Sequence, residues 1–180
     1  MIIAREKKKT NIVEYLVYMF QIENSIRALN FDERQIEEQL VNKYEQTEEV
    51  KVEIRNWYLD LSRMMIEEKI KEKGHLQFLR NILNDLYGVH IMLLKGGEDN
   101  SYENTYYQAR PDLELLHKKI GNPVAHDVET GVEGIYGYLL LQINNKETTV
   151  ETRAAITRIT EWLYLLATRY RQFEAGEREI

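Results

Sequence analysis

Apolar side chains recur at intervals of three and four residues in three stretches of this chain, and this spacing strongly constrains its fold. The stretches are Ile12, Tyr15, Met19, Ile22, Ile26 and Leu29; Leu76, Leu79, Leu83, Leu86, His90 and Leu93; and Ile156, Ile159, Leu163, Leu166, Tyr170 and Phe173. Such intervals place each set on one side of an α-helix and favour near-parallel packing in a left-handed bundle. The sequence therefore predicts an all-α protein.

The composition agrees with one helical domain. The chain has 180 residues, of which 43% are apolar and 30% charged, and only nine are Gly and two Pro. This length can bury a substantial core, and so few turn-forming residues argue against a β-sandwich. We expect a single all-helical domain over residues 1–180, a bundle of about six or seven helices that run mostly antiparallel.

Local signals predict where several helices begin and end. The first helix should run from near Ile2 or Thr10 to Leu29, and Asp32 should cap the second. Thr47 marks a break before a third helix, which the cations between Lys69 and Lys73 and then Gly74 should end.

Later in the chain, residues 96–101 form the clearest loop signal. Pro111 should interrupt the following segment, because proline pushes the preceding residue towards an extended conformation. A helix from Pro111 to Ile120 should close at the Gly-Asn-Pro sequence of residues 121–123. Two more helices should follow, the first ending near Asn145 and the second running from Val150, capped by Thr148 or Thr149, to Phe173.

Charge and residue usage narrow the function classes. The net charge of −6 argues against a nucleic-acid partner, and the basic run from Arg5 to Lys9 is typical of a solvated helix face. The chain has no cysteine, which excludes disulfides and thiolate metal sites. No apolar run is long enough to span a bilayer, and the charged start does not resemble a signal peptide. We expect a cytoplasmic protein without membrane contact.

Four polar residues are the candidates for a catalytic site. Glu114 and His117 form one E-x-x-H pair, the unit of di-metal bundles, but such a site needs a second pair and further carboxylates. Arg110 and His117 match the R-x(4–6)-H pattern of HEPN-type ribonucleases, although Pro111 stands where that family usually has a polar residue. With His126 these residues would have to line one cleft to form an active site.

Two further features have a structural and a functional interpretation. His90 lies on an apolar helix face and could be a ligand or a base, but a buried histidine more often has a structural role. Gly131, Gly134 and Gly137 are spaced by three residues, so they could allow close approach of another helix or line a ligand cleft.

The opening of the chain resembles the start of an uncharacterised family of Bacteroidetes proteins known only as a domain of unknown function. The similar residues are 2–19 (IIAREKKKTNIVEYLVYM) followed by QIE at 21–23, the GIYGYLLL sequence at 134–141, and the stretch from Leu163 to Tyr170. The resemblance extends over nearly the whole chain. It implies an all-helical bacterial protein without an assigned activity, and it supplies no catalytic residue.

The function that follows is a non-catalytic interaction or scaffold protein that self-associates or binds a protein partner. This interpretation depends on the apolar helix faces and on the lack of a convergent polar site in the sequence. We expect neither a cofactor nor a bound metal. The alternative is an enzyme or ligand-binding bundle, either a HEPN-like ribonuclease or a metal-binding protein, that uses the region from Arg110 to His126.

Overall fold

The computed structural model describes residues 2–121 and 126–177, and in these ranges its secondary structure consists of helices joined by turns and loops. The helices are α1 (Ile2–Thr10), α2 (Ile12–Ala28), α3 (Glu33–Gln39), the short 3₁₀ helix η1 (Val41–Lys43), α4 (Glu48–Glu67), α5 (Gln77–Gly96), α6 (Asn100–Ile120), α7 (Asp127–Ile143) and α8 (Val150–Glu174). The all-α prediction is confirmed. The described residues hold eight α-helices, more than the six or seven expected.

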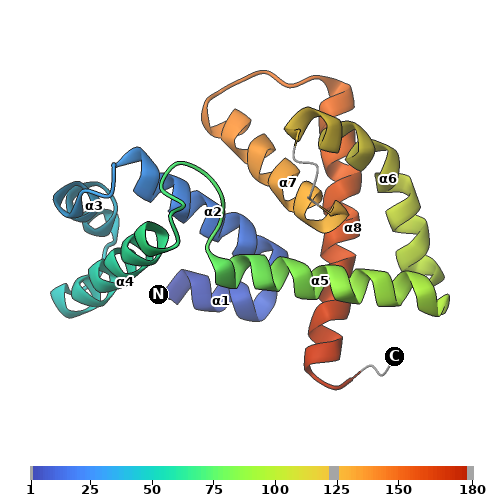
Figure 1. Ribbon diagram of the computed structural model, residues 1–180, viewed down its shortest axis with the longest axis horizontal. Helices are drawn as coiled ribbons and strands as arrows, with labels where there is room; N and C mark the ends of the chain where they lie inside the picture. The colour runs from blue at the N-terminus through green and yellow to red at the C-terminus, as the bar shows by residue number, and fades with distance from the viewer. Residues whose placement is uncertain (1, 122–125, 178–180) are drawn as a thin grey trace.

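The helices form two groups joined by α2 and α5 (Figure 1). α6, α7 and α8 pack on one another at one end, and α3 and α4 lie at the other. α2 contacts α4 as well as α7 and α8, while α5 crosses α8 and also packs on α7. α8 is the longest of the described helices and packs on α2, α5, α6 and α7.

The apolar faces predicted from the spacing are buried. All six positions of the first two stretches are less than 9% exposed. In the third stretch Ile159, Leu163 and Leu166 are buried, whereas Ile156, Tyr170 and Phe173 are half-buried. The buried residues form one continuous cluster, which shows that the periodicity identified the core correctly.

The first predicted helix is two helices, because the chain turns at Asn11. Asn11 has an extended backbone, with φ −153° and ψ 111°, and its side chain accepts hydrogen bonds from the amides of Val13 at 2.9 Å and Glu14 at 3.2 Å. This is an N-cap, which satisfies amides that the first turn of a helix leaves unpaired. α1 therefore folds back on α2.

Other predicted caps are confirmed. Asp32 accepts a hydrogen bond from the amide of Gln35 at 2.8 Å, and Thr149 accepts one from the amide of Thr152 at 3.1 Å. Thr47 lies at the N-cap position of α4, but its side chain makes no capping hydrogen bond. Gly121 ends α6 in the left-handed conformation with φ 69°. Asn122 and Pro123, the remainder of that predicted stop signal, lie outside the described residues.

The predicted end of the third helix is wrong. α4 ends at Glu67, and Lys69 adopts the left-handed conformation just after it, with φ 59°. Gly74, with φ 93°, lies seven residues beyond the helix end. The amide of Ile70 donates to the carbonyl of Met65 and that of Lys69 to Ile66, which is the Schellman pattern. Ile70 packs against the core, so tertiary burial stops the helix before its cationic residues.

The predicted interruption at Pro111 is also wrong, since α6 continues through it. Proline removes one backbone hydrogen bond and costs about 3 kcal/mol in a helix interior. Packing on α8 offsets this cost. Ala109 and Leu113 are fully buried, and Asp112 accepts two hydrogen bonds from the Arg158 guanidinium, at 2.7 and 3.0 Å.

None of the helices in the described part of the chain has both the length and the apolar composition of a membrane-spanning segment.

Candidate functional site

Arg110 and Glu114 lie on the outer surface of α6. They form an i,i+4 ion pair in which Nε of Arg110 is 3.1 Å from Oε1 of Glu114. Both side chains are more than half exposed, at 54% and 58%. Solvent-exposed ion pairs of this kind contribute little to the stability of a protein. The two residues therefore form part of the solvated face of α6.

His117 lies on the same helix but has a different environment. Nδ1 of its half-buried ring is 3.3 Å from the hydroxyl of Thr130 on α7. Arg110 lies two helical turns away, about 10 Å along the axis of α6. Glu114 and His117 also have separate partners, so the E-x-x-H pair does not converge on one point.

His126 caps the start of α7. Its Nδ1 accepts a hydrogen bond from the amide of Glu129 at 3.1 Å, and its ring stacks on Tyr87 with a centroid separation of 4.3 Å. Burial lowers the pKa of His126, although Glu129 and Asp127 oppose this shift. Nε2 is buried and makes no hydrogen bond to the described residues.

The four candidates therefore occupy three separate environments, because only Arg110 and Glu114 contact each other. Arg110 pairs with Glu114, His117 contacts Thr130, and His126 contacts Tyr87 and Glu129. Among the described residues, no group of three or more histidine and carboxylate side chains is placed to hold a metal ion. No hydrogen bond or ion pair among the described residues joins His117 or His126 to Arg110 or Glu114.

His90 belongs to a buried aromatic cluster between α5, α6 and α8. Its Nδ1 is 2.6 Å from the hydroxyl of Tyr102, and that hydroxyl accepts a hydrogen bond from Nε1 of Trp162 at 3.0 Å. The ring of Tyr106 stands edge-on to His90 with centroids 4.6 Å apart. Burial lowers the pKa of His90 to about 4, so at neutral pH the ring is uncharged and can accept the Tyr102 O–H. This geometry gives His90 a structural role.

The three glycines of α7 differ in their surroundings. A Cβ on Gly131 would lie 3.0 Å from Leu163 and 3.3 Å from both Ile159 and Trp162, and one on Gly134 would overlap the side chain of Leu116. No atom lies within 4 Å of the corresponding position on Gly137. Gly131 and Gly134 thus allow α7 to approach α8 and α6, which is the close-packing interpretation of the sequence pattern.

Alanine substitutions at Gly131 and Gly137 should have opposite effects on stability. Gly131→Ala should lower the free energy of unfolding by about 1–2 kcal/mol, because the three buried neighbours cannot move aside. Gly137→Ala should raise it by about 0.5–1 kcal/mol, because alanine is the better helix former and meets no neighbour. Urea denaturation measures both. Equal effects at the two positions would contradict this packing.

A buried carboxylate on α2 was not identified from the sequence. The side chain of Glu23 is fully buried, and it accepts a hydrogen bond from the amide of Leu76 at 2.8 Å. Its other oxygen lies 2.6 Å from Nδ1 of His75, whose ring stacks on Phe20. The sequence signal was a glutamate directly after Ile22, within the apolar stretch that forms α2. This arrangement attaches the start of α5 to α2.

An apolar hollow lies between α1, α2, α7 and α8, on the side where α7 and α8 diverge (Figure 1). We call it the α2–α8 groove. Its volume is about 250 Å³, and its lining residues are Lys7, Asn11, Val13, Glu14, Val17, Tyr18, Gln21, Ile135, Leu139, Thr160 and Tyr164. Valine, isoleucine and leucine side chains from α2 and α7 form its floor. Figure 1 shows α7 and α8 separating towards the loop that joins them.

The edges of the α2–α8 groove combine an exposed aromatic ring with one ion pair. Tyr164 on α8 is 63% exposed, which is high for a large apolar side chain beside a groove. At the other edge Nζ of Lys7 lies 3.0 Å from Oε2 of Glu14. Tyrosine next to an apolar floor and a polar rim is typical of protein–protein contact surfaces.

Comparison with known proteins adds the family and little else. A model described as "Domain of unknown function (DUF4924)" matches residues 1–177. Neither the curated proteins nor the solved structures contain a significant match to this chain.

Proposed function

The chain belongs to the DUF4924 family, for which no activity is assigned, and we propose that it is a non-catalytic protein that self-associates through the α2–α8 groove. The observation that carries the proposal is an open apolar groove with Tyr164, 63% exposed, at its edge. In a twofold dimer the same surface of each copy meets the other, so each Tyr164 can enter the partner's groove. The proposal keeps the expectation of a cytoplasmic bacterial protein, which rests on the cysteine-free sequence and the family resemblance.

Charge supports a second copy of this chain as the occupant. Two molecules that each carry −6 repel one another, so their contact surface has to be locally neutral. The ion pair of Lys7 and Glu14 gives the rim one charge of each sign. A twofold axis that brings the two ion pairs together would let Lys7 of each copy face Glu14 of the other, so the contact adds no net repulsion.

Tyr164→Glu should therefore dissociate the dimer. We expect sedimentation equilibrium of the wild type to show a monomer–dimer equilibrium at micromolar concentrations, and the variant to weaken it about thirtyfold or more, as for a central aromatic contact. Tyr107→Glu is the matched control, because Tyr107 is 54% exposed on α6 and does not line the groove.

Circular dichroism should show that both tyrosine variants keep the wild-type helix content. A strictly monomeric wild type at high concentration would overturn the proposal. So would a dimer that Tyr164→Glu leaves intact, since the contact would then lie on another surface. An unchanged Tyr107→Glu dimer together with a monomeric Tyr164→Glu protein is the expected result.

A further inference from the structure

A second hollow lies beside the α2–α8 groove, between α2, α1, η1 and α4. We call it the tyrosine pocket, and its volume is also about 250 Å³. Ile3, Ile22 and Leu40 give it an apolar part. Tyr18 and Gln21 line both this pocket and the α2–α8 groove, so the two hollows are neighbours along α2.

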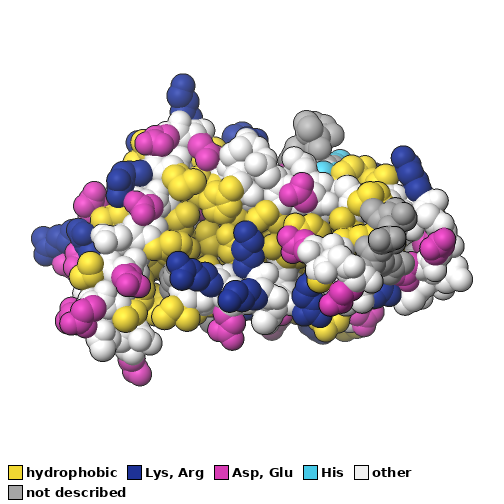
Figure 2. Space-filling model, turned by 90° about the horizontal axis from the view of Figure 1, so that it is seen from below, with side chains coloured by type: hydrophobic (Ala, Val, Ile, Leu, Met, Phe, Trp, Pro, Cys, Tyr) yellow, Lys and Arg dark blue, Asp and Glu magenta, His cyan; other side chains and the backbone are white. Residues whose placement is uncertain are grey.

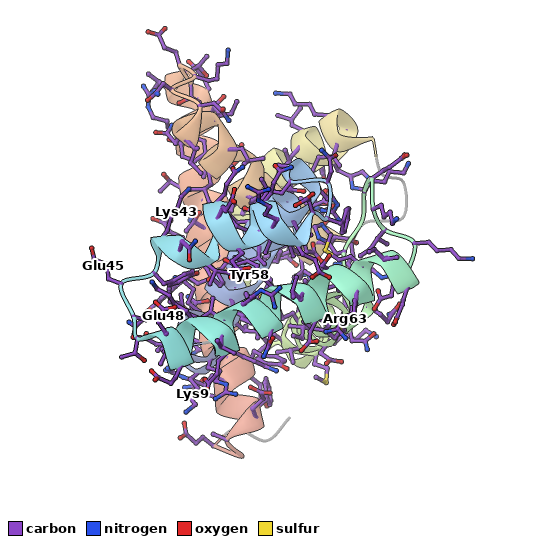
Figure 3. The ribbon with its side chains drawn as sticks, turned by 90° about the vertical axis from the view of Figure 1, so that its left-hand side faces the viewer. Lys9, Lys43, Glu45, Glu48, Tyr58 and Arg63 are labelled. Carbon is purple, nitrogen blue, oxygen red and sulfur yellow. The ribbon has the colours of Figure 1, made fainter. Side chains whose placement is uncertain are left out.

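Three tyrosine hydroxyls meet at the inner end of the pocket. The hydroxyls of Tyr44 and Tyr58 are 3.3 Å apart, and Tyr18 hydrogen-bonds with Tyr44. Tyr58 is only 2% exposed and lies on α4 in the space between α4 and the segment that carries η1 (Figure 3). Burial raises the pKa of Tyr18 and Tyr58, so these hydroxyls stay protonated at neutral pH. Because hydroxyl hydrogens rotate, the group can donate to an oxygen that enters the pocket.

A lysine stands at the mouth of the same pocket. Lys43, at the end of η1, is exposed and lines the hollow. In the described ranges 2–121 and 126–177, its ammonium group forms no ion pair, whereas Lys51 nearby is paired with Glu48 at 3.2 Å. Figure 3 shows Lys43 on the same end of the molecule as Tyr58. A cation and hydroxyl donors around an apolar hollow form a suitable site for a carboxylate with a hydrocarbon body.

We infer that the tyrosine pocket binds a small aliphatic monocarboxylate, with the carboxylate between Lys43 and the tyrosine hydroxyls and the hydrocarbon chain on Ile3, Ile22 and Leu40. The volume is below the range of about 300–1,000 Å³ that holds drug-sized ligands, which selects a short chain. This binding activity goes beyond self-association and does not depend on it.

Isothermal titration calorimetry with octanoate tests the inference. We expect one saturable site with a Kd below about 1 mM. Octan-1-ol, which has the same chain without the charge, should bind at least about tenfold more weakly. No saturable binding of octanoate, or equal affinity for the acid and the alcohol, would overturn the inference.

Two variants locate the bound acid. Lys43→Met should weaken octanoate binding about tenfold or more, because it removes the charge-assisted contact at an exposed position that does not affect folding. Lys146→Met, an equal charge change at the exposed start of the α7–α8 loop, should bind like the wild type.

Ser25→Phe should abolish binding, since Ser25 lines the pocket and the larger ring would fill it. Unchanged affinity in both Lys43→Met and Ser25→Phe would place the acid elsewhere and overturn the inference. The readout differs from the sedimentation experiment, so failure of one proposal does not imply failure of the other.

Discussion

Replacement of Glu23 by alanine should lower the free energy of unfolding by about 3–5 kcal/mol, one of the two largest effects that we expect in this protein. The carboxylate is fully buried and accepts from the Leu76 amide at 2.8 Å, and its second oxygen lies 2.6 Å from Nδ1 of His75. Removing the Glu23 carboxylate leaves the buried Leu76 amide and the half-buried His75 ring without their hydrogen-bond partner. Single truncation of a buried polar pair is costly for that reason.

Chemical denaturation measures the effect, with Glu53→Ala as control. Glu53 is an exposed glutamate on α4, and its replacement should change stability by less than about 0.5 kcal/mol. Glu23→Gln keeps the volume and one acceptor oxygen, so it should fall between the wild type and Glu23→Ala. A Glu23→Ala protein as stable as Glu53→Ala would show that the buried carboxylate does not hold α5 on α2.

Tyr102→Phe should destabilise the protein by about 2–4 kcal/mol although it removes one oxygen atom. This hydroxyl accepts a hydrogen bond from Trp162 at 3.0 Å and lies 2.6 Å from Nδ1 of His90. Tyr102 and Trp162 are fully buried and His90 is 2% exposed, so water cannot replace the lost partner. Each buried polar group left unsatisfied costs about 1–3 kcal/mol.

The control for Tyr102 lies five residues along the same helix. Tyr107 is 54% exposed, and Tyr107→Phe should leave the denaturation midpoint unchanged. A double-mutant cycle of Tyr102→Phe with His90→Phe should show a favourable coupling between the two side chains. Additive effects in that cycle would mean that the hydrogen bond contributes nothing to folding.

Helix caps were predictable where the signal was local. Asp32 and Thr149 each accept a hydrogen bond from an amide three residues ahead, a contact that depends only on the first turn of the helix. Gly121 ends α6 because glycine adopts a positive φ without steric cost. Such contacts depend on neighbours within a few residues, so the sequence pattern was sufficient at these positions, although the equally local cap at Asn11 was not predicted.

Predictions failed where distant packing opposed a local preference. Pro111 stays inside α6 because Ala109 and Leu113 are buried and Asp112 binds Arg158 on α8, 46 residues away along the chain. α4 stops before its lysines because Ile70 enters the core. Local propensities amount to about 3 kcal/mol or less per residue, and the burial of a few side chains exceeds this.

The same reasoning explains why the four candidate residues do not converge and why Glu23 was not among them. Arg110, Glu114, His117 and His126 were chosen for their chemistry and short spacing, but the direction of each side chain depends on the neighbouring helix. Glu23 escaped notice because one glutamate in an apolar stretch has no sequence partner. Its partners, His75 and Leu76, are more than 50 residues away.

The apolar surface and the two hollows depend on the assembled fold, because each combines residues from several helices. Figure 2 shows apolar side chains gathered on one face of the molecule among lysines and arginines, although each contributing helix has a mixed composition. The α2–α8 groove combines residues of α1 and α2 with residues of α7 and α8 that follow more than 110 positions later. The tyrosine pocket likewise needs α1, α2, η1 and α4 together.

The sequence by itself determined that the chain is helical and which side of each main helix is buried, since a helix repeats every 3.6 residues and water excludes apolar faces wherever they fall. Only the tertiary structure decided where α7 and α8 diverge, which hydroxyls meet, and which charges remain at the surface. These depend on how helices cross, and crossing geometry is set by the shapes of side chains from distant parts of the chain.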